Sequence, residues 1–182
     1  MKKVARPITA RYLQNAAAFY LERYPATAEG LRRVLHRRVR KAQMLEAPIV
    51  ADVKGLIDAI VAKFVDSGVI DDKAFAQTKA RALHRRGTSA KLMRHRLKLA
   101  GVDDATLDKA MAGLDEELAL DPRQREIKAA VALARRRRLG PFREKDREGK
   151  RDRDLAVMAR AGFDYDLARK VIDAKDRDII DP

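Results

Sequence analysis

Two pairs of adjacent carboxylates are the residues of this sequence best suited to chemistry. Asp71 and Asp72 form one pair, and Asp103 and Asp104 form the other. Paired carboxylates can hold Mg²⁺ for phosphodiester hydrolysis. Each pair, however, directly precedes a segment with helical periodicity, where aspartate is among the best residues to accept hydrogen bonds from the first free amides. We therefore interpret both pairs as helix caps, and a nuclease that uses them with Mg²⁺ is an alternative.

Other groups suited to catalysis or metal binding are scarce. The sequence contains no cysteine, which excludes disulfides and thiolate ligands, and it has neither a glycine-rich phosphate loop nor a Gly-x-Ser-x-Gly motif. Its three histidines, His36, His84 and His95, lie among arginines that would repel a metal cation. We therefore expect no catalytic residue, no metal site and no cofactor.

Basic residues far outnumber acidic ones. The 182-residue chain has 41 Lys and Arg against 27 Asp and Glu, a net charge of +14. No acid occurs between Gly30 and Leu45 or between Asp72 and Asp103. Such a charge excess indicates a nucleic acid or an acidic protein surface as partner. The predicted contact residues are Arg33, Arg37, Lys41, Arg81, Arg85, Arg86, Lys91, Arg94, Lys98, Arg135, Arg136, Arg137 and Arg138.

A membrane is a less suitable partner. No apolar run approaches the ~18 residues that a membrane span requires, and the basic segments lack Trp and wide apolar faces. The lysines at the N-terminus are not followed by the apolar stretch of a signal peptide. We expect a cytoplasmic protein without membrane contact.

Helical periodicity and helix boundary signals cover most of the chain. Thr9 and Thr27 are placed to cap two helices, and a third is predicted to begin at Pro48. Thr88 or Ser89 can cap a later helix. The predicted units are a flexible arm at 1–8, three-helix repeats at 9–68, 69–120 and 121–176, a solvated charged loop at 141–154 within the third repeat, and a tail at 177–182.

A short internal repeat supports the tandem arrangement. The sequence Ala-Gly-apolar-Asp occurs at 100–103 and again, 61 residues later, at 161–164. A weaker similarity joins the segments that begin at Arg23 and Arg86. Small helical units of this kind bury their apolar faces against their neighbours. We therefore predict an all-α fold of three tandem three-helix repeats stacked into a curved, elongated rod.

The middle and last units resemble a known protein family. The similarity spans about Tyr12 to Ile172, while the run Arg135–Arg138 and the segment 141–154 depart from the family pattern. The matching residues resemble the core signature and closing repeat of the RecX family: Ile70-Asp71-Asp72, Phe75-Ala76, Arg86-Gly87, a basic helix up to Leu97 and Gly101, and Ala161-Gly162-Phe163.

This resemblance implies a regulator of the RecA recombinase, with inhibition as the expected direction. Members bind the RecA filament on single-stranded DNA along its groove and so modulate homologous recombination, DNA repair and the SOS response. The family supplies no catalytic residue; it implies Asp72 as a cap, Phe75 as a core residue, and Gly87 and Gly101 as helix ends. We expect a monomer for which DNA is a salt-sensitive auxiliary contact. The alternative is a helical protein that binds DNA or RNA without sequence specificity and without a recombinase partner.

Overall fold

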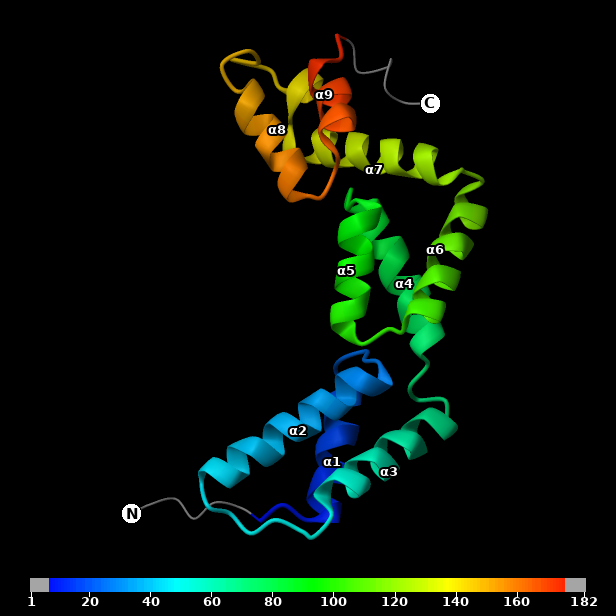
Figure 1. Cartoon of the computed structure of the whole chain (residues 1–182), viewed down its shortest axis with the longest axis vertical. Helices are drawn as coiled ribbons and strands as arrows, with labels where there is room; N and C mark the ends of the chain where they lie inside the picture. The colour runs from blue at the N-terminus through cyan, green and yellow to red at the C-terminus, as the bar shows by residue number, and fades with distance from the viewer. Residues whose placement is uncertain (1–6, 176–182) are drawn as a thin grey trace. The chain divides into compact units, whose positions relative to one another are not determined.

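The computed structural model describes residues 7–175, and in this part of the chain it contains nine α-helices, one short 3₁₀ helix and no β-strand (Figure 1). The all-α fold predicted from the sequence is confirmed. The described residues divide into two compact units, the first holding 7–75 and 100–102 and the second holding 76–99 and 103–175. The tail at 177–182 and most of the predicted arm lie outside the described residues, and the stacking of three repeats into a rod stays a prediction.

Three helices build the first unit, and each packs against the other two. They are α1 (Ala10–Leu21), α2 (Ala28–Met44) and α3 (Val53–Asp66). The caps predicted for the first two are confirmed, since Thr9 accepts a hydrogen bond from Tyr12 N and Thr27 accepts one from Gly30 N. Apolar side chains at helical spacing form the core, with Leu13, Leu31, Leu35, Ile57 and Val61 fully buried.

The third helix begins later than predicted. Its N-cap is Asp52, whose carboxylate accepts a hydrogen bond from Gly55 N at 3.1 Å, so Pro48 precedes the helix. The segment around Pro48 is extended because it pairs with the start of the chain. Ile8 N donates to the carbonyl of Pro48 at 2.8 Å, and Val50 N donates to the carbonyl of Ile8 at 3.0 Å.

This pairing also corrects the end of the predicted arm. Ile8 forms an isolated parallel bridge with Ile49 and is only 3 % exposed. Burial of such a side chain stabilises the fold by about 1.5–3 kcal/mol. Ile8 therefore belongs to the core of the first unit and not to a flexible arm.

The remaining helices contribute to the second unit, apart from the start of α4 and the last residue of α5. Their bounds are α4 (Asp72–Arg85), α5 (Ala90–Ala100), α6 (Asp104–Leu118), α7 (Pro122–Arg137), η1 (Gly140–Phe142), α8 (Arg151–Arg160) and α9 (Tyr165–Asp173). Asp103, Asp121 and Asp164 cap α6, α7 and α9 through the expected backbone amides. The helices α7, α8 and α9 enclose an apolar core that includes Met158, Val171 and Ile172.

The charged segment at 141–154 is only in part the solvated loop that the sequence predicts. Residues 144–146, 148 and 149 are exposed as expected, but the two ends of the segment are buried. Pro141 and Phe142 are buried, and Asp154 is 1 % exposed. Its carboxylate accepts hydrogen bonds from Gly140 N at 2.9 Å and from Arg143 Nη2 at 2.6 Å. The same carboxylate raises the pKa of the Arg143 guanidinium. A buried charge is tolerated only when it is paired, and this pairing allows Asp154 to be buried against the core.

Asp71 and Asp72 have different roles, which corrects the expectation that Asp72 caps its own helix. Asp71 Oδ1 accepts hydrogen bonds from Lys73 N and Ala74 N, both at 2.9 Å, and is therefore the cap of α4. Asp72 Oδ1 instead accepts from Ala28 N at 2.8 Å, the first amide of α2. Phe75, expected in the core, is only partly buried.

The repeated Ala-Gly sequence makes the same hydrogen bond in each unit, which we call the hydroxyl junction. In the first unit, Thr27 Oγ1 donates to the carbonyl of Ala100 at 2.5 Å. In the second, Ser89 Oγ donates to the carbonyl of Ala161 at 2.8 Å. Each hydroxyl also caps its own helix, since it accepts from Gly30 N or Leu92 N. One side chain thus ties the start of a helix to the end of another.

A carboxylate reinforces each hydroxyl junction. Ala28 N donates to Asp72 in the first unit, and Ala90 N donates to Glu126 Oε2 at 2.8 Å in the second. Burial raises the pKa of Glu126, while the hydrogen bond from Ala90 N opposes the rise. The glycines of the repeat are required because Gly101 and Gly162 have φ of +95° and +88°. A Cβ atom on them would lie 2.9 Å from Thr27 Oγ1 and 2.4 Å from Ser89 Oγ.

Candidate nucleic-acid interface

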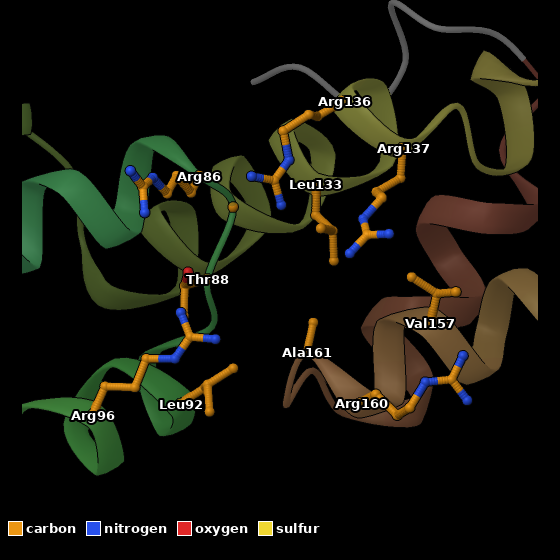
Figure 2. A pocket seen from close by; sticks show the side chains of 11 residues that line it. Arg86, Thr88, Leu92, Arg96, Leu133, Arg136, Arg137, Val157, Arg160 and Ala161 are labelled. Carbon is orange, nitrogen blue, oxygen red and sulfur yellow. The ribbon is translucent and has the colours of Figure 1, made fainter. Parts of the chain in front are cut away.

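A basic cleft lies in the second unit, where the turn between α4 and α5 meets α5, α7 and α8 (Figure 2). Its volume is about 400 Å³. We refer to it as the arginine cleft. Its lining consists of Arg86, Gly87, Thr88, Leu92, Arg96, Leu133, Arg136, Arg137, Val157, Arg160 and Ala161.

The hydroxyl junction of the second unit is what brings these elements together. Because Ser89 bonds to the carbonyl of Ala161, the start of α5 is held at the end of α8, and Arg96 and Arg160 line one cleft. The bond from Ala90 N to Glu126 holds the same end of α5 against α7. Tertiary contacts, and not sequence proximity, therefore assemble the cleft.

The cleft combines an apolar floor with guanidinium groups. Figure 2 shows Leu92, Leu133 and Ala161 facing the hollow, with the guanidinium of Arg137 extending into it from α7. Arg160 lies at the rim with its guanidinium turned outward. The consecutive arginines Arg136 and Arg137 come from the last turn of α7, where the helix dipole favours cations by a few tenths of a kcal/mol.

All charged side chains that line the cleft are positive. Its five arginines are all exposed, and no carboxylate lines it. Within residues 7–175, none of the five forms an ion pair with Asp or Glu. Guanidinium is planar, always charged and geometrically matched to phosphate oxygens. The cleft is therefore suited to bind one or more phosphate groups.

The sequence identified part of this site. Arg86, Arg136 and Arg137 were predicted contact residues, and the structure places all three in the arginine cleft. Arg96 and Arg160 were missed. Arg96 lies in the same acid-free segment as Arg86, and Arg160 directly precedes the repeated Ala-Gly sequence. Both signals existed, but neither indicated that the two side chains converge.

Four other predicted contact residues are paired with carboxylates outside the cleft. The pairs are Arg33 with Glu29 at 2.8 Å, Arg81 with Glu117 at 2.5 Å, Arg94 with Asp108 at 2.6 Å and Lys98 with Asp104 at 2.6 Å. Exposed pairs of this kind are worth about 0–1 kcal/mol. A phosphate can therefore displace the carboxylate at low cost, but these side chains present less free charge than the cleft.

The other predicted contact residues also lie outside the cleft. Arg37 and Lys41 are exposed on α2 in the first unit, and Arg85 and Lys91 are exposed in the second. Arg135 Cζ lies 5.6 Å from the ring centroid of Phe142. Arg138 ends α7 with a left-handed backbone conformation. Their contact with a partner stays a prediction.

A buried polar cluster lies elsewhere in the second unit. Arg125, 4 % exposed, places Nε 2.8 Å from Asp115 Oδ1. Burial and, to a lesser extent, the charge of Arg125 lower the pKa of the nearby His84, with Lys128 acting in the same direction and Asp115 against it. The folded chain thus favours the neutral form of His84.

This arrangement predicts a loss of stability on acidification. Below the ordinary histidine pKa of 6.5 the unfolded chain binds a proton at this position that the folded chain resists, so the free energy of unfolding falls as pH falls. Replacing His84→Gln should make that fall smaller. Urea unfolding of both proteins between about pH 7.5 and pH 5.5 measures the difference. Identical pH dependence in the two proteins would show that His84 does not contribute.

Residues 7–175 show neither a metal-binding group nor a membrane-spanning helix. No group of three or more His, Asp or Glu side chains there is arranged to hold a metal ion. No helix there is both long enough and apolar enough to cross a membrane.

The chain is similar in sequence to known regulatory proteins. Residues 71–111 match the family model described as RecX, second three-helix domain. The regulatory protein RecX of Myxococcus xanthus is 40% identical over 174 residues, which are 94% of this chain and 90% of that protein. The regulatory protein RecX of Agrobacterium fabrum is 29% identical over 162 residues, 88% of this chain and 82% of that protein.

The fold is also similar to solved structures. The crystal structure of RecX from Lactobacillus salivarius superposes with a TM-score of 0.58 at 20% identity, covering 90% of this chain and 94% of that one. A crystal structure of regulatory protein RecX gives a TM-score of 0.55 at 17% identity, covering 91% of this chain and 72% of that one. At these identities the structural comparison supports the fold alone.

Proposed function

The chain belongs to the RecX family, and from this membership we propose that it regulates, in the inhibitory direction, the RecA recombinase. It binds the RecA filament on single-stranded DNA along the groove of that filament. By limiting the filament it modulates homologous recombination, DNA repair and the SOS response. It acts as a monomer in the cytoplasm and uses no cofactor.

The observation that carries this proposal is the arginine cleft. Five arginines line a cleft of about 400 Å³ that no carboxylate lines, and the guanidinium of Arg137 extends into it. That volume accepts a few phosphate groups of a nucleic-acid backbone. A nucleoprotein filament on single-stranded DNA offers a ligand of this kind.

The size of the expected salt effect follows from the number of arginines. If about three of them each neutralise a phosphate of a single strand, the affinity falls with a logarithmic slope of about −2 in salt concentration. Raising the salt concentration from about 50 to about 200 mM then lowers the affinity for the strand by about 20-fold. Contacts with the recombinase itself must supply the rest of the affinity.

The test is a titration of the single-stranded-DNA-dependent ATPase activity of RecA from the same cell. A basic helical protein with a scrambled sequence and equal charge is the control. We expect inhibition at well below one copy per recombinase subunit, and no inhibition by the control. Equal inhibition by both proteins, at saturating amounts only and removed by salt, would contradict filament-specific action.

That contrary outcome would support the second candidate function. The cleft recognises phosphate by charge and geometry, and neither property requires a recombinase. A helical protein that binds DNA or RNA without sequence specificity would show the same cleft. Its affinity would follow salt concentration alone and would be independent of RecA.

A further inference from the structure

An exposed group of aromatic side chains lies at the end of α1 in the first unit. Phe19 is 53 % exposed and Tyr24 is 56 % exposed, although the chain has only five Phe, four Tyr and no Trp. The guanidinium carbon of Arg23 lies 3.7 Å from the centroid of the Phe19 ring. The rings of Tyr20 and Tyr24 have centroids 5.3 Å apart and planes tilted by 36°. We call Phe19, Tyr20, Arg23 and Tyr24 the aromatic cluster.

The packing of α1 accounts for Tyr20, which is partly buried against the core, but not for Phe19 and Tyr24. The helix contributes Leu13 and Ala17 to the core as its fully buried residues, while Phe19 and Tyr24 leave about half of their surface to water. Large aromatic surfaces are normally buried, and exposed ones gathered in one place indicate a binding site. The guanidinium of Arg23 covers one face of the Phe19 ring, so a flat ligand stacks on the guanidinium plane or displaces it from the ring.

Bases of nucleic acid are flat groups that bind both aromatic rings and guanidinium planes. In a duplex the bases are stacked on one another, so only an unpaired strand can offer them. The charge around the cluster suits such a strand, because α1 contains no acidic residue, Arg11 and Arg23 are exposed, and Glu22 directly follows the helix. A strongly positive chain favours this polyanion over a protein partner.

We propose that the aromatic cluster stacks unpaired bases of a single-stranded nucleic acid. This site is separate from the arginine cleft, and its chemistry is different, since it binds bases and the cleft binds phosphates. Stacking on an aromatic face is tolerant of sequence because every base has such a face. The site operates on a bare strand and does not depend on a recombinase.

The first test compares two oligonucleotides of equal length, one with mixed bases and one made of abasic sites, in fluorescence anisotropy titrations at fixed salt. We expect the double variant F19A/Y24A to bind the normal strand about 10–100-fold more weakly and the abasic strand as tightly as the unchanged protein does. Tyr165→Ala, which removes an exposed tyrosine from the second unit, is the control and should leave both affinities unchanged.

A second measurement does not depend on losing side chains. Phe19→Trp introduces the only tryptophan of the chain, and its emission should be quenched by the normal strand and not by the abasic one. The proposal is overturned if F19A/Y24A binds the normal strand as tightly as the unchanged protein does, or weakens on both strands equally. It is also overturned if the unchanged protein binds neither strand. Because RecA is absent from these titrations, their failure would leave the proposed regulation of RecA untouched.

Discussion

Replacing Arg86, Arg136 and Arg137 together by glutamate is expected to weaken binding to the RecA filament by about 100-fold and to remove inhibition of its ATPase activity. The three side chains line one cleft, so the change replaces three attractions for phosphate by three repulsions. Each changed unit of charge at a solvated surface is worth about 0.5 kcal/mol, and six of them give about 3 kcal/mol. Every 1.4 kcal/mol is about a factor of ten in affinity.

A matched variant separates the cleft from net charge. Lys145, Arg153 and Arg169 are exposed in the same unit, do not line the cleft, and change the charge by the same amount when replaced by glutamate. We expect this control to weaken filament binding by less than about 5-fold, because distant surface charges are screened beyond about 10 Å. Equal losses in the two triple variants would mean that overall charge, and not the arginine cleft, determines binding.

Gly162→Ala is expected to lower the free energy of unfolding by about 3 kcal/mol. The new Cβ would lie 2.4 Å from Ser89 Oγ, and the φ of +88° is one that alanine rarely adopts. Overpacking and backbone strain each cost about 1–3 kcal/mol. Urea unfolding of the full chain, followed by helical circular dichroism, measures the change.

Two further variants show whether the hydroxyl junction is the cause. Ser89→Ala should lower the free energy of unfolding by about 1–2 kcal/mol, since it removes a cap and a buried hydrogen bond. The double variant S89A/G162A should lose less than the sum of the two single losses, because the overlap between the new Cβ and Ser89 Oγ is gone. Gly113→Ala is the control, since a Cβ there meets nothing within 4 Å inside α6, and it should stabilise by up to about 1 kcal/mol. If the losses in unfolding free energy of S89A and G162A simply added in the double variant, the overlap at the hydroxyl junction would not be the cause.

Local signals predicted much of the fold. Thr9, Thr27 and Asp103 cap helices as the sequence indicates, because capping depends on residues only two or three positions apart. The recurrence of Ala-Gly was also visible. Its meaning was not, since the hydroxyl junction joins residues more than seventy positions apart.

The errors share that cause. Ile8 and Asp154 are buried by partners that periodicity and capping rules do not identify: the extended segment at Pro48–Val50 for Ile8, and Arg143 with Gly140 N for Asp154. At the site, charge clustering identified Arg86 and the end of α7. It could not identify Arg96 and Arg160, because their approach depends on the contact between Ser89 and Ala161.

The most direct measurement is photo-crosslinking from the arginine cleft in the assembled RecA filament on labelled single-stranded DNA. A photoreactive phenylalanine analogue replaces Leu92, which lies on the floor of the cleft, and in a control protein it replaces Tyr165, which is exposed outside it. The account predicts a crosslink to the DNA strand from position 92, lost when Arg86, Arg136 and Arg137 are reversed, and none from position 165. A strand crosslink from position 165 with none from position 92 would contradict it.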